Sequence, residues 1–235
     1  MKECYIVGAG EFFGSIHPCE EDLVIAADGG VRYLLSKGII PDVIVGDFDS
    51  LSENEDETNV FLTEAMGRVK NCIEKTASES LCEINGKQVE IFRHPIMKDE
   101  TDMYLAYEIG REKGYTDFKL YGGVGGREDH TFANYCLLLR AKNDKNNLVL
   151  VGNNTKTFVI KNEKKEVTGE CGATLSVFAF GTDAKGVSIK GLKYEADDVT
   201  LDSACPLGVS NSFLWEGKGE ISVSDGALLV IAYDR

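Results

Sequence analysis

The feature that most constrains this chain is a short β-branched run that stops abruptly at paired carboxylates. Val43–Val45 leads through a glycine into Asp47 and Asp49, so a buried strand would end at closely spaced negative charges. Such charge is costly unless a cation shares the site. Mg²⁺ prefers carboxylate and phosphate oxygens as ligands, and the segment therefore predicts a strand that delivers a metal-binding loop.

Strand-like runs of the same kind recur through the first half and alternate with helical patterns. The expected strands are Cys4–Val7, Leu23–Ala26, Val43–Val45, Val89–Phe92 and Phe118–Tyr121. One expected helix has a face shared by Met103, Ala106, Tyr107 and Gly110, and a second has a face shared by Ala133, Cys136, Leu137 and Arg140. Asp99 or Thr101 would cap the first of these helices and Thr131 the second. The alternation predicts an α/β N-terminal domain with a mostly parallel sheet.

The character changes near Asn147, where short strand-like runs follow one another closely between Gly, Asn and Asp turns. A long helical period is absent from this sequence, which predicts a small all-β, sandwich-like domain. Lys142–Asn147 is the expected boundary, giving domains at 1–145 and 146–235. The polar, acidic stretch Leu51–Gly86 is expected to be a helix with loops.

The composition limits which binding partners and which cellular compartment are expected for this protein. A formal charge of −14 over 235 residues argues against a surface for nucleic acid or anionic membrane. The seven cysteines lack CxxC spacing, so neither a disulfide framework nor a zinc site is indicated, and most are expected to be buried. Neither a signal peptide nor a membrane span is evident, and the expected location is cytoplasmic.

The loops after the predicted strands carry the chemistry, because the carboxyl ends of parallel strands meet at one edge of the sheet. In ADGG, Asp28 precedes Gly29 and Gly30, which would let the backbone approach a bound anion. A simple Asp-Gly turn is the alternative. GAGEFFG, Gly8–Gly14, is equally consistent with a tight turn and with a phosphate-contacting loop.

KDETD stands at the start of a predicted amphipathic helix. Asp102 is a candidate metal ligand, Lys98 a candidate phosphate contact, and Asp99 and Thr101 complete the candidate ATP-binding segment. The alternative is a solvated first helical turn whose acids complement the helix dipole.

GGVGGREDH is the richest of these loops in glycine. Gly125 and Gly126 permit a backbone cradle for an anion, and Arg127 offers a planar fork for phosphate. Asp129 and His130 follow at a helix start. Asp129 is alternatively an N-cap, and His130 is more typical of a positioning or core residue than of a general base. The GK[ST] ending of a Walker P-loop is missing.

Taken together, ADGG, GDFDS, KDETD and GGxGGRxDHxxxN, which ends at Asn134, resemble the thiamine pyrophosphokinase family in motif and order. GVSN, Gly208–Asn211, resembles the family's C-terminal signature. The resemblance covers essentially the whole chain. It implies an α/β ATP- and Mg²⁺-binding catalytic domain, an all-β thiamine-binding and dimerisation domain, and a homodimer that transfers pyrophosphate from ATP to thiamine, giving thiamine diphosphate and AMP.

Within that reading, Asp47, Asp49 and Asp102 would hold Mg²⁺, and Arg127 would offset charge on the transferred group. Asp129 or a metal-bound acid would accept the hydroxyl proton. Ser210 and Asn211 would bind thiamine, alternatively forming an Asn turn. Trp215 is left out of the predicted site, because an interior or interface tryptophan is the plainer interpretation.

Two other functions are compatible with parts of the sequence. GDFDS also resembles the nucleophile loop of haloacid-dehalogenase phosphatases, in which Asp47 would be the nucleophile and Asp49 an acid/base. That reading leaves ADGG and GGVGGREDH unexplained. A non-catalytic nucleotide-binding module is the second alternative, and the density of acids near the expected metal argues against it.

Overall fold

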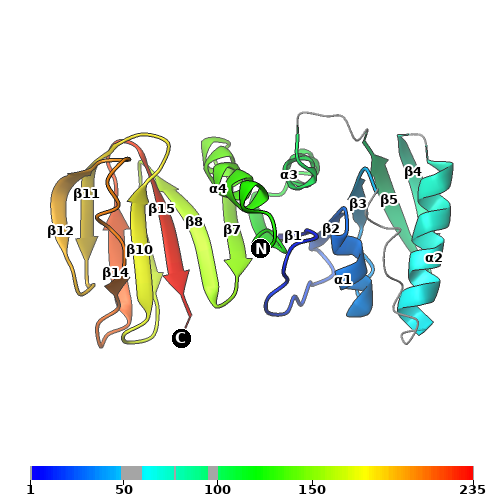
Figure 1. The fold of residues 1–235 in the computed structure, drawn as a ribbon, viewed down its shortest axis with the longest axis horizontal. Coiled ribbons are helices and arrows are strands. Elements are labelled where there is room, and N and C mark those ends of the chain that lie inside the picture. Colours follow the sequence, from blue (N-terminus) through cyan, green and yellow to red (C-terminus); the bar gives the residue numbers. More distant parts are fainter. Residues whose placement is uncertain (1, 49–59, 77, 95–99, 235) are drawn as a thin grey trace. The chain divides into compact units, whose positions relative to one another are not determined.

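The chain folds into two compact units, seen in a computed structural model that describes residues 2–48, 60–76, 78–94 and 100–234 (Figure 1). The units are Met1–Asn134 and Tyr135–Arg235. The division falls inside helix α4, Glu128–Asn143, rather than in the Lys142–Asn147 segment where the sequence places it. Among the described residues, none of the helices is both long and apolar enough to cross a membrane.

The first unit alternates strands with helices, as the sequence predicts. Its elements are β1 (Cys4–Val7), β2 (Leu23–Ala27), α1 (Gly30–Ser36), β3 (Val43–Gly46), α2 (Val60–Lys75), β4 (Glu79–Ile84), β5 (Lys87–Arg93), α3 (Asp102–Glu112) and β6 (Asp117–Tyr121). All five predicted strands are present. The stretch expected to be a helix with loops holds α2 but also the strand β4.

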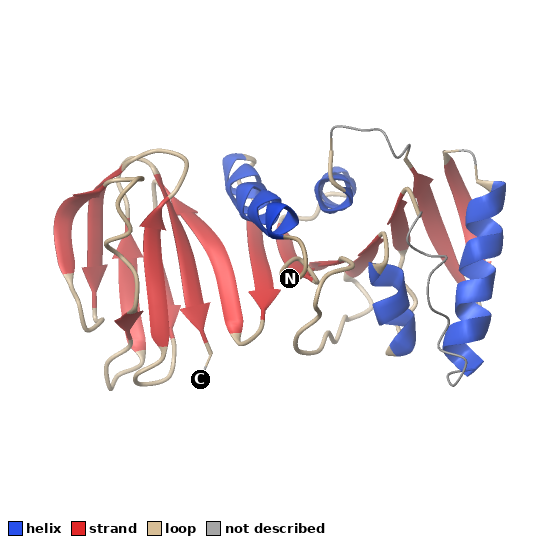
Figure 2. Cartoon of the chain, in the orientation of Figure 1, coloured by secondary structure: helices blue, strands red, loops and turns tan. Residues whose placement is uncertain are grey.

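The sheet of this unit has the order β6-β1-β2-β3-β5-β4, parallel throughout except for β4, which runs antiparallel to β5. Helices lie on both faces, with α3 packed over β1, β2 and β3 (Figures 1 and 2). Strands covered on both sides must be apolar at every position, which explains the fully buried runs of β1, β2 and β3.

The strand order creates the place where a ligand can bind. The chain proceeds from β1 outward through β2 and β3 on one side, and later returns to add β6 on the other side of β1. The strand order therefore reverses its direction at β1. A parallel sheet opens a crevice at such a switch point, beyond the carboxyl ends of the strands.

The two long helices near this crevice test the predicted faces. In α3 the buried residues are Met103, Ala106, Tyr107 and Gly110, as predicted. In α4 the buried residues are Asn134, Leu137, Leu138 and Ala141, so Leu137 alone is buried among the four residues named for its shared face. Cys136 and Arg140 are exposed. The buried residues of α4 keep the helical spacing of three and four, but the first of them, Asn134, is polar.

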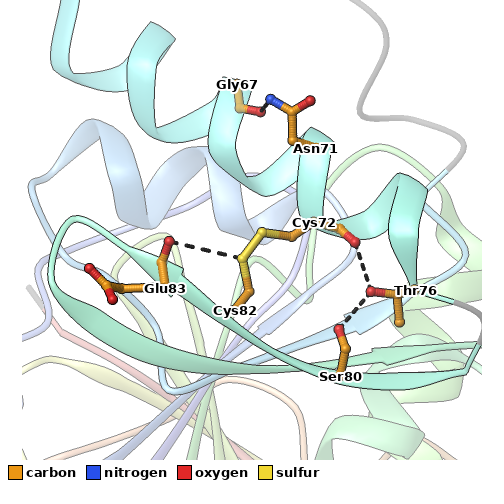
Figure 3. The surroundings of a disulfide bond; sticks show 7 residues. All are labelled: Gly67, Asn71, Cys72, Thr76, Ser80, Cys82 and Glu83. Atoms are coloured by element: carbon orange, nitrogen blue, oxygen red, sulfur yellow. Dashed lines mark hydrogen bonds between the residues drawn. A yellow bond between two sulfur atoms is a disulfide. The ribbon is translucent and has the colours of Figure 1, made fainter.

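The cysteines also differ from the prediction. Cys72 of α2 and Cys82 of β4 form a disulfide that ties the helix to the edge strand (Figure 3). Thr76, whose hydroxyl donates to the Cys72 carbonyl at 2.7 Å and contacts the Ser80 hydroxyl, adds a polar link beside it. Of the described cysteines outside this disulfide, Cys4 is buried and the others are exposed: Cys19, Cys136, Cys171 and Cys205. Most are therefore not buried core residues.

The second unit is an antiparallel β-structure, as predicted. Its elements are β7 (Asn147–Gly152), β8 (Thr155–Lys161), β9 (Lys164–Thr168), β10 (Thr174–Ala179), β11 (Ala184–Lys190), β12 (Ala196–Leu201), β13 (Asn211–Ser212), β14 (Lys218–Ser222) and β15 (Ala227–Tyr233). Strands β13, β10, β15, β8 and β7 lie side by side, and β12, β11, β14 and β9 form a second sheet. A shared core takes residues from both sheets, including Val177, Val187, Ile221 and Val230, which gives the sandwich its stability.

Candidate active site

A cavity of about 490 Å³ lies at the carboxyl ends of the parallel strands of the first unit. Its walls come from the loops after β1, β2 and β6 and from the first turns of α3 and α4. The predicted site residues that line it are Asp28, Thr101, Asp102, Gly125, Gly126, Arg127 and His130. Segments far apart in the sequence thus meet at the switch point of the sheet, which is where ligands bind in such folds.

The loops after β1 and β6 form one continuous wall of the cavity. The amide of Gly10 donates to the carbonyl of Gly122 at 2.9 Å, and the amide of Glu11 donates to that of Val124 at 3.0 Å. A Cβ atom on Gly10 would lie 2.6 Å from the Gly122 oxygen, so only glycine allows this approach. The GAGEFFG segment is thereby shown to border the cavity.

Aromatic stacking fixes the loop that follows β1. The ring of Phe12 lies between those of Tyr33 and Tyr121, with centroids 3.4 Å and 5.1 Å away. Tyr33 belongs to α1 and Tyr121 ends β6, so the stack joins the loop to both elements. Stacked rings add specific geometry to the apolar area that they bury, and the loop is held in place next to the cavity.

The ADGG turn contributes Asp28 to the cavity but not its glycines. Asp28 adopts a left-handed backbone, with φ of 48°, and its amide donates to the carbonyl of Val45 at 2.8 Å. Neither Gly29 nor Gly30 lines the cavity. A Cβ on Gly30 would lie 1.9 Å from the Val7 oxygen, so this glycine lets α1 pack against β1. Its presence is explained by packing.

Only one of the predicted metal ligands that the structure describes lines the cavity. Asp102 lines the cavity, and Asp47 stands half-buried at the end of β3 without lining it. Asp49 lies outside the described residues. In the described part of the chain, groups of three or more His, Cys, Asp or Glu side chains that could hold a metal ion are absent. The carboxylates of Asp28 and Glu100 line the cavity beside Asp102 and supply further hard oxygen donors.

Thr101 begins the α3 wall of the cavity. Its backbone is extended, with φ of −78° and ψ of 154°, and its hydroxyl accepts a hydrogen bond from the amide of Tyr104 at 3.2 Å. Thr101 is therefore the N-cap, as the sequence predicts. Lys98 and Asp99 lie outside the described residues. Thr131 is not a cap, because α4 begins at Glu128 and the Thr131 hydroxyl donates to the carbonyl of Arg127 within the helix.

Arg127 and Asp129 form an exposed ion pair at the mouth of the cavity. Arg127 Nη2 lies 2.6 Å from Asp129 Oδ2, and the two side chains are 71% and 62% exposed. The hydrogen bond from Arg127 lowers the pKa of Asp129 from 3.8 to about 2, and the same contact raises the pKa of Arg127. The amide of His130 donates to Asp129 Oδ1 at 3.0 Å. Asp129 is therefore ionised at neutral pH and aligned with the guanidinium.

The GVSN segment lies in the second unit. Ser210 is exposed, with φ of 60°, and its amide donates to the Ser176 hydroxyl at 3.0 Å. Asn211 is buried, and its amide side chain accepts from the Tyr194 amide and donates to the Tyr194 carbonyl, at 3.0 Å and 2.7 Å. Asn211 thus holds the backbone of Tyr194, and Ser210 is the freely accessible member of the pair.

Several residues that line the cavity are missing from the site predicted from the sequence. These are Gly8, Ala9, Gly10, Ala27, Glu100, Met103, Gly122, Gly123 and Asn134. The GxG spacing directly after a strand was the available signal for the first three. For Asn134 the available signal was a polar residue at a position where the helical period is otherwise apolar.

Comparison with known families accounts for nearly the whole chain. The family model described as "Thiamin pyrophosphokinase, catalytic domain" matches residues 19–150. A second, described as "Thiamin pyrophosphokinase, vitamin B1 binding domain", matches residues 157–228. The thiamine pyrophosphokinase of Bacillus subtilis is 29% identical over 220 residues, which cover 90% of this chain and 87% of that protein.

Solved structures share the fold. A crystal structure of thiamine pyrophosphokinase from Bacillus subtilis superposes with a TM-score of 0.79 at 22% identity, covering 100% of this chain and 99% of that one. One from Geobacillus thermodenitrificans has a TM-score of 0.77 at 22% identity, with 99% and 98% covered. Because the catalytic-domain match alone spans more than half of its residues, the chain belongs to the thiamin pyrophosphokinase family.

Proposed function

We propose that the cavity of the first unit binds the polyphosphate of ATP and is the site of the family's reaction. The chain is an ATP-dependent thiamine pyrophosphokinase, which transfers pyrophosphate to the hydroxyl of thiamine and releases AMP. The observation that carries the assignment of the site is the cavity itself. It combines two hydrogen-bonded glycine loops, several carboxylates and one guanidinium at the switch point of a parallel sheet.

The glycine loops and Arg127 are the groups suited to the phosphates. Glycines allow close approach of a phosphate to the backbone, whose amides bind anions without adding a full charge. Arg127 presents a planar fork that matches phosphate oxygens, and it lines the cavity. In phosphoryl chemistry, positioning and stabilisation of charge supply most of the rate enhancement, so these groups would carry much of the catalysis.

Carboxylates from separate loops are the proposed magnesium ligands, although the described residues hold no ready-made group of three. Asp28, Glu100 and Asp102 line the cavity with the glycine loops and would offer hard oxygen ligands. Asp47 and Asp49 belong to the same proposed set. When bound, Mg²⁺ would neutralise phosphate charge and polarise the transferred group. A chain with a formal charge of −14 needs such neutralisation to bind a polyanion.

Asp129 is better suited to orienting Arg127 than to accepting a proton. A carboxylate with a pKa of about 2 is a weak base. Its hydrogen bonds to Arg127 fix the direction of the guanidinium instead. A metal-associated carboxylate therefore remains the candidate acceptor for the proton of the attacking hydroxyl.

We further propose that thiamine binds at the GVSN segment of the second unit and that the enzyme works as a homodimer in the cytoplasm. Large apolar side chains are exposed on either side of β13, namely Leu207, Val209, Leu214 and Trp215, with exposures of 74%, 56%, 42% and 87%. Apolar residues gathered around one short strand are typical of an interface. Trp215 is thus not an interior residue, and Ser210 and Asn211 remain the proposed thiamine contacts.

Substitution of the carboxylates tests the site. Asp47→Asn and Asp102→Asn should each lower turnover on the order of 100-fold at saturating Mg²⁺, because the lost charge contributes mainly in the transition state. Asp225→Asn is the matched control, since Asp225 is exposed in the second unit and pairs only loosely with Lys185, at 3.7 Å. Near-normal turnover in the Asp102 variant, with the control also unchanged, would remove Asp102 from the site.

A further inference from the structure

The glycine loop that follows β6 is held by hydrogen bonds to three of its successive carbonyls. Those of Gly122, Gly123 and Val124 each accept one hydrogen bond, at 2.9, 2.7 and 3.0 Å. The donors to the outer two are backbone amides of the loop after β1. The donor to the middle one is the side-chain amide of Asn134. A single side chain therefore completes the set of contacts that fixes this wall of the cavity.

The loop needs such a contact because its sequence imposes little conformation. Gly122, Gly125 and Gly126 all have positive φ angles, and glycine populates these and other regions with similar ease. In a trans peptide the carbonyl and the next amide point in opposite directions. Holding the Gly123 carbonyl therefore also sets the direction of the Val124 amide.

Asn134 is well placed to act in this way. It is 4% exposed, lies inside α4 rather than on a loop, and also lines the cavity. A helix offers a more rigid support than a loop for a positioning contact. The neutral amide is a hydrogen-bond donor at every physiological pH, whereas an ionised aspartate of the same shape is only an acceptor. The position therefore has a chemical reason to be asparagine.

We propose that Asn134 is a positioning residue that fixes the phosphate-binding loop, Gly122–Gly126, through the carbonyl of Gly123. This inference rests on the proposed function of the cavity as the ATP site. Asn134 acts through the loop backbone and is not itself assigned a contact with substrate. Without it, the loop would sample conformations that do not bind phosphate, and nucleotide affinity would fall.

The test compares Asn134→Asp, which keeps the shape but loses the donor, with Asn71→Asp. Asn71 provides a matched control because its side-chain amide donates to the Gly67 carbonyl in α2, at 2.9 Å, outside the cavity (Figure 3). Asn134→Ala is included in case the buried carboxylate prevents folding. Hydrogen exchange of the ligand-free proteins and calorimetric titration with MgATP are the two measurements.

Both Asn134 variants should exchange the Gly10 and Glu11 amides faster, because these amides donate to the Gly122 and Val124 carbonyls of the loop, with the rest of α4 and β6 unchanged. Their affinity for MgATP should fall about 10-fold, as expected for a lost buried hydrogen bond, while the Asn71 variant matches the wild type. Unchanged exchange of the Gly10 and Glu11 amides, or faster exchange throughout the unit, would overturn the positioning role. Failure of the wild type to bind MgATP would instead refute the proposed function, and the exchange measurement would still decide the role of Asn134 in the loop.

Discussion

At the scale of single residues, the ion pair between Arg127 and Asp129 shows how a neighbouring guanidinium sets the protonation state of a carboxyl group. Both side chains are largely exposed, so the pair contributes orientation more than stability. Because the pKa of Asp129 is depressed, the attraction is fully present above the ordinary value of 3.8 and is lost as pH falls toward about 2. The pair therefore remains intact across the neutral range.

We expect the carboxyl carbon of Asp129 to titrate near pH 2 in the wild type when followed by NMR. In Arg127→Ala the midpoint should move up toward the ordinary value of 3.8, because the main cause of the shift is gone. Lys156→Ala, which removes the partner of the exposed Asp234, serves as a control and should leave Asp129 unchanged. An Asp129 midpoint that is the same with and without Arg127 would contradict the assignment.

At the scale of elements, packing decides the role of two glycines. Gly30 begins α1, where a Cβ would collide with the Val7 carbonyl, and Gly67 lies inside α2 with open space around it. Gly30→Ala should lower the free energy of unfolding by at least about 2 kcal/mol through overpacking. Gly67→Ala should raise it by about 0.5–1 kcal/mol, since alanine favours the helix. Urea denaturation distinguishes these outcomes, and equal effects would contradict the packing account.

The disulfide gives a second test at this scale. Cys72 and Cys82 are separated by 10 residues, and closing a loop of that size stabilises a fold by up to about 3 kcal/mol. Dithiothreitol should lower the unfolding midpoint of the wild type and of Cys19→Ser, whose cysteine is exposed and free. The Cys72→Ser variant should not respond. A wild-type midpoint that is indifferent to reductant would contradict a disulfide in solution.

The same elements show what the sequence could predict. The strands β1, β2 and β3 were predictable because burial on both faces demands unbroken apolar runs. Strand β4 was missed, since its outward residues, such as Leu81 at 71% exposure and Glu83, give no such run. The burial of Asn134 in α4 was not predicted because the residue is polar, and its reason for burial is a contact with the loop that precedes the helix.

The candidate site was predictable to the extent that its residues lie in the loops and helix starts that follow strands. Asp28, Asp102 and Arg127 were found in this way and do line the cavity. Asp47 follows a strand too, but it does not line the cavity in the described structure. Gly30 does not line the cavity and packs against β1, a difference that a motif does not reveal, so its contact with a ligand stays a prediction.

At the scale of the whole molecule, the proposed homodimer makes a strong prediction. If the thiamine site combines the first unit of one chain with the second unit of its partner, Asp47→Asn and Ser210→Lys chains should complement each other. Ser210 is exposed, so lysine is tolerated by the fold, while its charge and bulk would repel the thiazolium cation. After refolding an equal mixture, about a quarter of wild-type activity should return, since half of the dimers have one intact site.

Two controls make this experiment decisive. Each variant refolded alone should keep only its low residual activity, and mixing folded variants without dissociation should recover less than refolding them together. An equal mixture of Asp47→Asn and Asp102→Asn chains should not recover, because both lesions fall in the same unit. Recovery in that control, or its absence in the main mixture, would contradict a site shared between chains.

The central claim is that this chain transfers an intact pyrophosphoryl group from ATP to thiamine. The most direct measurement is to incubate the purified wild-type protein with ATP, Mg²⁺ and thiamine and to quantify the products by chromatography. The account predicts AMP and thiamine diphosphate in equal amounts, with none of either when Mg²⁺ is chelated. Formation of ADP with thiamine monophosphate, release of inorganic phosphate alone, or nucleotide binding without turnover would contradict it.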